Sequence, residues 1–169
     1  AAAMVAGPFG VSAAAAQDFP ALTGRVVDAA NIIPPAEEAA LAQKLQAFET
    51  RNQRQFVVAT VPDLQGYDIE SYGYQLGRTW GIGSEENDDG ALLIVAPNER
   101  KVRIEVGYGL EPILTDGLSF LIINRQILPL FKQGDMPCGI AAGADAIIQQ
   151  LELPPEQAAE IAAAANEEA

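Results

Sequence analysis

The sequence predicts an α/β fold in which a mixed β-sheet is sandwiched between α-helices within a single domain. Two observations carry this prediction: short apolar runs typical of buried strands alternate with amphipathic helical segments, and two of the strand-like runs are joined by a short turn. Of the 169 residues, 49% are hydrophobic, which is enough for one sizeable core. We therefore expect one domain, over residues 17–153.

Residues 1–16 read AAAMVAGPFGVSAAAA and carry no charge. Ala14 and Ala16 form an A-x-A-like cleavage site before Gln17, as at the end of a secretory signal peptide. We interpret this stretch as a residual signal-peptide segment, so the protein is expected to be periplasmic or otherwise exported. The alternative is the N-terminal arm of a cytosolic protein. No later run reaches the ~20 apolar residues that a transmembrane helix needs.

The first half of the domain contains two expected helices around one strand. After an extended stretch over residues 19–35, the helix expected over residues 36–50 places Leu41, Leu45 and Phe48 on one face. The run FVVATV predicts a buried strand over residues 56–61. A helix over residues 69–80 follows, with apolar and aromatic residues three or four positions apart: Ile69, Tyr72, Leu76 and Trp80. We interpret Tyr67, Tyr72, Tyr74 and Trp80 as core and boundary packing residues rather than a ligand-stacking set.

The second half of the domain starts with a predicted antiparallel hairpin. Residues 91–96 (ALLIVA) form a buried strand, and residues 101–106 alternate apolar with charged side chains, as in a strand exposed on one side. Two helices follow over residues 118–131 and 139–151. Residues 154–169 are acidic and alanine-rich and have almost nothing to bury, so they are expected to form a flexible tail.

The formal net charge of −13 disfavours nucleic acid as a partner, because this charge repels phosphate groups. The chain contains no histidine, which removes Ser-His-Asp and Cys-His catalysis and nearly all zinc sites. Cys138 is the single cysteine, so an intrachain disulfide is excluded. We expect Cys138 to be a buried small hydrophobic residue rather than a reactive thiol.

Several acidic residues are expected at one end of the sheet. The loop SEENDDG precedes the second strand and GYGLE follows the third, and these strands are antiparallel, so both segments reach the same end. Thr115 or Asp116 is expected to cap the next helix nearby. Clustered carboxylates favour a hard cation such as calcium. The alternative is that Asp88, Asp89 and Gly90 form only a turn.

Five segments together resemble the TPM domain family, which includes exported bacterial proteins and thylakoid lumen proteins linked to photosystem II repair. The resemblance runs from about Gly24 to Leu151 and is carried, in order, by VVDAANIIP, FVVATV, WGIGSEENDDGALLIV, RKVRIEVGYGLEPILTD and ILPLFKQGDMPCGI. It implies an α/β sandwich around a mixed sheet. It also implies a metal site, whose ligands would be Asp88, Asp89, Glu111 and Asp116.

The resemblance implies two competing functions. Some members resemble calcium-binding modules with no demonstrated reaction, whereas some plant members are described as acid phosphatases. We favour a calcium-binding interaction module that assists the assembly or repair of an envelope protein complex through a protein partner, with magnesium and manganese as other candidate ions. The alternative is a metal-dependent acid phosphatase. The sequence names no catalytic residue, so enzymatic activity is left open with a preference against it.

Overall fold

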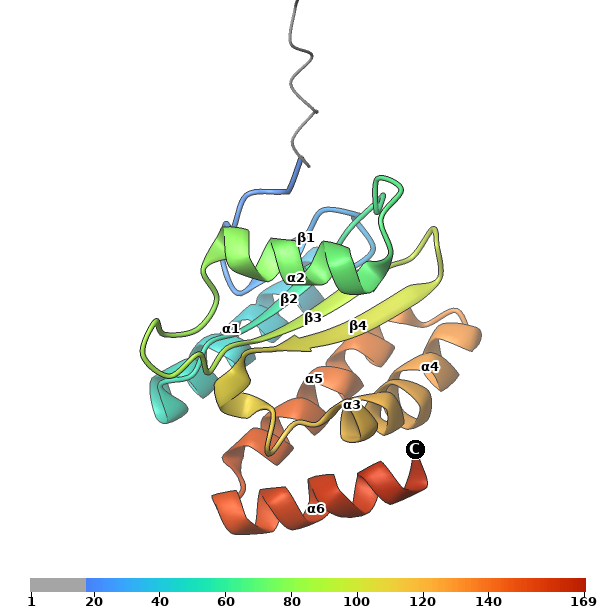
Figure 1. Cartoon of the computed structure of the whole chain (residues 1–169). Helices are drawn as coiled ribbons and strands as arrows, with labels where there is room; N and C mark the ends of the chain where they lie inside the picture. The colour runs from blue at the N-terminus through green and yellow to red at the C-terminus, as the bar shows by residue number, and fades with distance from the viewer. Residues whose placement is uncertain (1–17) are drawn as a thin grey trace, which may run out of the picture.

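The computed structural model describes residues 18–169, so the expected signal-peptide segment lies outside the described residues. The chain alternates strands and helices and then ends in a run of helices (Figure 1). The elements are β1 (Val26–Asp28), α1 (Pro35–Asn52), β2 (Phe56–Thr60), α2 (Ile69–Trp80), β3 (Ala91–Ala96), β4 (Lys101–Val106), the 3₁₀ turn η1 (Tyr108–Leu110), α3 (Asp116–Ile122), the π-helical η2 (Ile123–Ile127), α4 (Leu128–Lys132), α5 (Met136–Glu152) and α6 (Pro155–Glu168).

The four strands form one mixed sheet in the order β1-β2-β3-β4. β1 pairs with β2 and β2 with β3 in parallel, and β4 returns antiparallel to β3 with Ala91 opposite Val106. The predicted hairpin is confirmed at both of its strands. β1 was not predicted as a strand, because its three residues lie within a stretch that the sequence marks only as extended. β4 and β1 are the two edges of the sheet.

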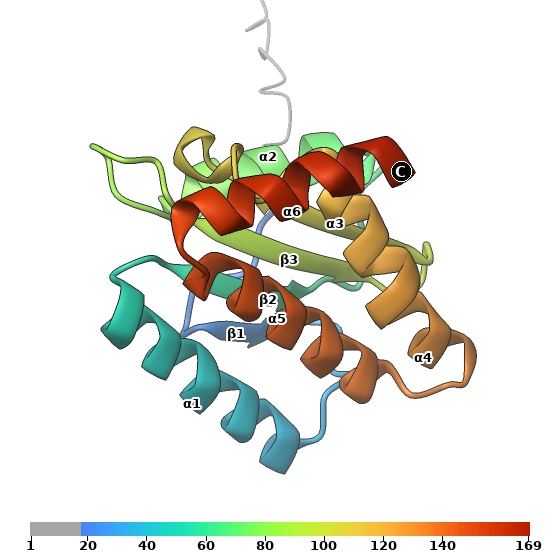
Figure 2. The same cartoon turned by 90° about the horizontal axis from the view of Figure 1, so that it is seen from below.

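One face of the sheet carries most of the core. α1 and α5 cover this face, and α3 and α6 lie on the same side (Figures 1 and 2). The predicted helix face is confirmed, because Leu41, Leu45 and Phe48 of α1 are all buried. Phe48 meets Phe56 of β2 edge to face, with ring centroids 6.4 Å apart. Five buried hydrophobic residues of α5 and α6 extend this core away from the sheet: Ile140, Ala144, Ile147, Leu151 and Ala158.

The opposite face is covered by α2 and by the described N-terminal segment. Tyr72 and Leu76 of α2 pack on Leu92 and Ile94 of β3, and Phe19 meets Tyr72 edge to face at 5.2 Å. Burial of the Tyr72 side chain raises the pKa of its hydroxyl group. The buried residues of α2 are Ile69, Tyr72, Gly73 and Leu76, and Trp80 is partly buried against the same core.

The helix expected over residues 118–131 is three consecutive segments, α3, η2 and α4. Pro129 explains the π-helical segment between the two α-helices. Proline has no amide hydrogen and its ring crowds the carbonyl group four residues before it, so a wider turn relieves the conflict. The following helix α5 starts at Met136, three residues earlier than predicted, because Asp135 accepts a hydrogen bond from the Cys138 amide at 3.2 Å and caps the helix.

The expectation that residues 154–169 have almost nothing to bury is wrong. Helix α6 buries Ala158, Ala162 and Ala165, and it packs against α3. Small side chains on one face allow a close approach: a Cβ atom on Gly117 of α3 would lie 2.2 Å from the Oδ1 atom of Asn166. Alanine therefore supplies both the helix propensity and the flat contact surface here. Residues 18–169 include no helix that is both long and apolar enough to span a membrane.

Candidate functional site

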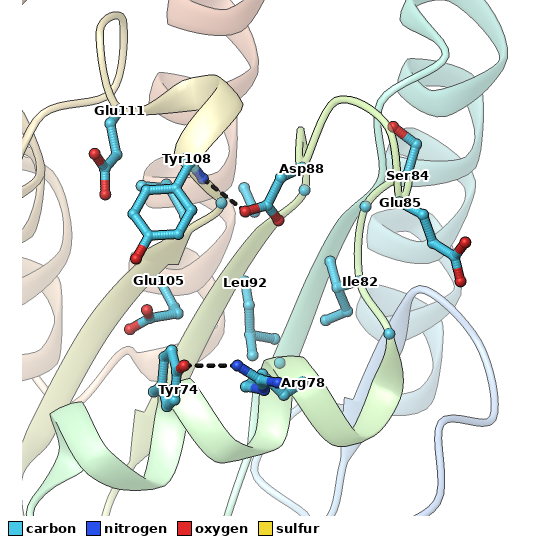
Figure 3. Close-up of a pocket in the computed structure, with 17 residues that line it drawn as sticks. Tyr74, Arg78, Ile82, Ser84, Glu85, Asp88, Leu92, Glu105, Tyr108 and Glu111 are labelled. Carbon is cyan, nitrogen blue, oxygen red and sulfur yellow. Dashed lines mark hydrogen bonds between the residues drawn. The ribbon is translucent and has the colours of Figure 1, made fainter.

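A pocket of about 630 Å³ opens beside the C-terminal half of α2 (Figure 3). Its walls come from α2, from the loop over residues 81–90, from the start of β3 and the end of β4, and from η1. Five side chains matter most for its chemistry: Tyr74 and Arg78 of α2, Asp88 of the loop, Tyr108 of η1 and Glu111 just after η1. The predicted meeting of SEENDDG and GYGLE at one end of the sheet is thus confirmed.

Asp88 joins the loop to the segment that follows β4. Its backbone has φ = 47°, a left-handed conformation that aspartate tolerates better than most residues. The Asp88 carbonyl accepts a hydrogen bond from the Gly109 amide at 2.9 Å, and Asp88 Oδ2 accepts one from the Tyr108 amide at 3.1 Å. The turn lies at residues 85–87 and not at Asp88, Asp89 and Gly90 as predicted, because the Asp88 amide donates back to the Ser84 carbonyl at 2.8 Å. The other carboxylate oxygen of Asp88 has no hydrogen-bond partner among the described residues.

Gly107 and Gly109 are required because the loop backbone lies directly against them. A Cβ atom on Gly107 would lie 2.1 Å from the Asp88 carbonyl oxygen, and one on Gly109 would lie 2.0 Å from that of Asn87. Gly107 has φ = −73°, which any residue adopts. Gly107 is therefore needed for the close approach of the loop backbone and not for an unusual backbone conformation. The glycines hold the acidic loop against the start of η1.

The other predicted ligands occupy different positions. Asp89 Oδ1 accepts hydrogen bonds from the Ser84 amide at 3.1 Å and the Ser84 hydroxyl group at 2.9 Å, which closes the loop on itself. Asp116 lies in the first turn of α3, whose cap is Thr115. The structure brings Asp88 and Glu111 to the same pocket and places neither Asp89 nor Asp116 on its wall. Within residues 18–169, no three acidic or cysteine side chains converge as a metal site.

Two further carboxylates line the pocket, those of Glu85 in the loop and Glu105 in β4. Glu105 is paired with Arg103 of the same strand at 3.1 Å, so part of its charge is already balanced. Arg78 is the one basic residue on the wall of this pocket. The charged side chains on the pocket wall therefore sum to a net negative charge, and the side-chain atoms that could coordinate a cation are mainly oxygens.

Tyr74 and Arg78 are site residues that sequence reasoning missed. They lie four positions apart on α2, so their side chains meet: the Arg78 guanidinium group donates a hydrogen bond to the Tyr74 hydroxyl group at 2.8 Å and lies 5.5 Å from its ring centroid. The i, i+4 spacing of these two residues in the sequence could have indicated this contact. Tyr72 and Trp80 do pack as predicted, and the Trp80 indole N–H donates to the Pro20 carbonyl at 2.9 Å. Tyr74 instead is 51% exposed at the pocket.

Cys138 is exposed, so its expected burial is wrong. It lies in the first turn of α5, where the neighbouring Gly139 faces Phe131 and Cys138 turns to solvent. A hydrogen bond and the negative charge of Asp135 raise the pKa of the Cys138 thiol, and the charge of Glu37 adds to this rise. A raised pKa keeps the thiol protonated, which agrees with the expectation that Cys138 is not a reactive nucleophile.

The fold and the pocket define a single α/β domain with an acidic, oxygen-lined pocket at one end of a mixed sheet. The family model of the TPM domain matches residues 26–150, which is most of the chain. The chain therefore belongs to the TPM domain family, as its sequence motifs indicated. None of the curated proteins compared with the chain matches it.

Solved structures agree with this assignment. The N-terminal domain of a P. gingivalis protein is 35% identical, with a TM-score of 0.71 over 77% of this chain and 83% of that one. The BA42 protein of Bizionia argentinensis is 18% identical, with a TM-score of 0.63 over 74% of this chain and 93% of that one. The N-terminal domain of the cg2496 protein of Corynebacterium glutamicum is 17% identical, with a TM-score of 0.60 over 82% and 88%. The last two show the fold alone.

Proposed function

We propose that this TPM domain is an exported interaction module that binds a divalent cation, calcium first among the candidates, in the pocket between α2 and η1. The observation that supports this most is that Asp88 and Glu111, two of the four predicted ligands, line one pocket together. The proposal includes a protein partner in the cell envelope, whose complex the domain would help to assemble or repair.

The donors present suit a hard cation. Calcium takes six to eight oxygen ligands from carboxylates, carbonyl groups and water, and this pocket offers carboxylates without histidine or thiolate. Asp88 and Glu111 would hold the ion, and water would supply the ligands that the protein does not. Because Asp88 also binds the Tyr108 amide, the ion would tie the acidic loop to η1. Asp89 would act by holding the loop, through Ser84.

The test is a calcium titration of the 169-residue chain by calorimetry, with thermal melts in calcium and in chelator. Asp88→Asn and Glu111→Gln are the matched variants, because each removes a charge and keeps an oxygen. The amide oxygen introduced by Asp88→Asn can still accept the hydrogen bond from the Tyr108 amide. We expect heat of binding and a stabilisation of about 2.7 kcal/mol when calcium is at 100 times its Kd. Both effects should be lost in the double variant.

The control is the double variant Glu160→Gln and Glu167→Gln, which removes the same number of charges from exposed positions of α6. It should bind calcium as the unchanged chain does. Equal loss in both double variants would mean that net charge alone attracts the ion. No heat and no shift of the melting temperature in the unchanged chain would contradict the cation site. Repeating the titration with magnesium and manganese identifies the preferred ion.

A metal-dependent phosphatase is the second candidate, and Arg78 is the observation that favours it. A guanidinium group binds phosphate oxygens, and this one lies on the wall of the acidic pocket. A bound cation would offset the charge of the phosphate group and activate water. The test is hydrolysis of p-nitrophenyl phosphate with each metal. Activity that depends on metal and falls at least about tenfold in Arg78→Gln supports this candidate, whereas no turnover with any metal contradicts it.

A further inference from the structure

We propose that the outer edge of β4 binds an extended segment of a partner protein, and that this segment alternates apolar with acidic side chains. β4 is the last strand of the sheet and pairs only with β3 in the part of the chain that the structure describes. Six residues form this edge strand. This edge adjoins the pocket, because Glu105 and Val106 at the end of β4 also line the pocket, but the inference does not depend on which ligand the pocket takes.

The register of the hairpin shows which backbone groups are free. The Gly107 amide donates to the Gly90 carbonyl at 2.9 Å, so these two residues form a hydrogen-bonded pair. Hydrogen-bonded and non-hydrogen-bonded pairs alternate along an antiparallel ladder. Arg103 and Glu105 therefore turn their amide and carbonyl groups toward β3. Three residues turn theirs outward: Val102, Ile104 and Val106.

The side chains along this edge define what the added strand would carry. Ile104 is buried, and Val102 and Val106 pack against the larger core, so apolar partner residues fit beside them. On the α2 face, the position beside Lys101 favours an acidic residue, whereas Arg103 is already paired with Glu105 of the same strand at 3.1 Å. Arg100 and Lys101 are both exposed, and neither forms an ion pair with any residue of the range 18–169. This basic cluster stands out in a chain with a net charge of −13.

An extended partner segment without a helix packed on it fits this edge better than a second copy of the chain does. α2 lies over both β3 and β4: a Cβ atom on Gly73 would lie 2.6 Å from the Ile94 side chain of β3 and 3.7 Å and 3.8 Å from the side chains of Glu105 and Arg103 of β4. Neighbouring strands are about 4.8 Å apart, whereas packed helices need about 8–10 Å between their axes. Pairing β4 with the β4 of another copy would bring two α2 helices into the same space. A segment that brings no helix avoids this conflict.

The experiment titrates the ¹⁵N-labelled 169-residue chain with a capped nine-residue peptide of alternating valine and glutamate. The expected result is that the amide signals of Val102, Ile104 and Val106 shift and exchange more slowly with solvent. Lys101→Glu should weaken binding about fivefold, whereas Lys132→Glu, an equal charge change on exposed α4, should not. A peptide of alternating valine and lysine should bind more weakly.

A backbone variant tests the pairing itself. Val102→Pro removes an outward amide and leaves the ladder to β3 intact, so binding should fall about tenfold or more. Val102→Thr keeps the amide and should bind normally. If Val102→Pro does not fold, the Lys101→Glu and Lys132→Glu variants still test the proposal. Three results would overturn the proposal: no change at the β4 amides at millimolar peptide, equal binding of the lysine peptide, or a dimer by light scattering that forms through this edge.

Discussion

The two faces of the sheet differ in how much protein covers them. The face that carries α1 and α5 is also backed by α3 and, farther out, by α6 (Figure 2). The other face is covered by α2 and the short segment around Phe19, and the acidic pocket opens there. The thick face supplies most of the core, and the thin face carries the acidic pocket. Stability would thus be separated from the binding that we propose for this pocket.

Glycine has a different role on each face. On the thick face, a Cβ atom on Gly139 would lie 2.5 Å from the Phe131 ring and one on Gly143 would lie 2.5 Å from the Ile127 side chain. These glycines let α5 approach the π-helical segment and α4, and the nearest atoms in the way are side chains. At the pocket, Gly107 and Gly109 face backbone carbonyl groups, which cannot change rotamer. Substitutions at the pocket must therefore move the loop itself.

The largest effect that would test this comparison is removal of α6. Ending the chain after residue 153 removes the buried Ala158, Ala162 and Ala165 and exposes apolar residues of α3 and α5. We expect the free energy of unfolding to fall by about 3–5 kcal/mol in urea titrations. Calcium affinity should change little, since α6 does not line the pocket. An unchanged free energy of unfolding would restore the expected flexible tail, and would contradict the packing of α6.

Substitution of Gln150 should have the next largest effect on the free energy of unfolding. It is 5% exposed, and its side-chain amide nitrogen donates to the carbonyl groups of Ile113 at 2.7 Å and Ala158 at 2.8 Å. It thus joins α5 to α6 and to the segment before α3. Gln150→Leu leaves both carbonyl groups without this donor and should cost about 2–3 kcal/mol in the free energy of unfolding. The neighbouring Gln149→Leu, at an exposed position, should change it by less than about 0.5 kcal/mol.

The same comparison explains what the sequence could predict. Periodicity located α1, α2, β2, β3 and β4 well, because each buries one clear face or is buried throughout. The convergence of the two acidic segments followed from the antiparallel hairpin. Ala158 and Gln150 could not be recognised in this way, since alanine carries no strong hydrophobic signal and a buried glutamine is identified only by its partners. The ligand set was predicted as a group, but Asp116 starts a helix outside the pocket wall.

Arg78 and Tyr74 were missed for a related reason. Their helix was assigned a packing role from Tyr72 and Leu76, and the exposed face of the same helix was left without a function. A helix that covers the thin side of a sheet has one face in the core and one at the pocket. The sequence pattern separates the core-facing residues of α2 from its exposed residues. Only the strand order shows which of the exposed residues lie beside the acidic loop.

Of the three changes expected to destabilise the domain, Gly107→Ala on the thin face should have the smallest effect on global stability. The added methyl group would lie 2.1 Å from the Asp88 carbonyl oxygen, so the loop must shift away from η1. We expect the free energy of unfolding to fall by only about 1–2 kcal/mol, because the displaced residues belong to a solvent-exposed loop. Faster amide exchange should be confined to Tyr108 and Gly109, whose amide groups bind Asp88.

Gly77→Ala is the matched control, because Gly77 also lines the pocket but has no atom within 4 Å of the added Cβ position. It should keep the pocket intact and stabilise α2 by up to about 1 kcal/mol through helix propensity. Calcium binding should weaken at least about tenfold in Gly107→Ala and be unchanged in Gly77→Ala, as measured by calorimetry. If Gly107→Ala instead lowers global stability as much as the loss of α6 does, the loop belongs to the main cooperative core. The division between a thick stabilising face and a thin binding face would then be wrong.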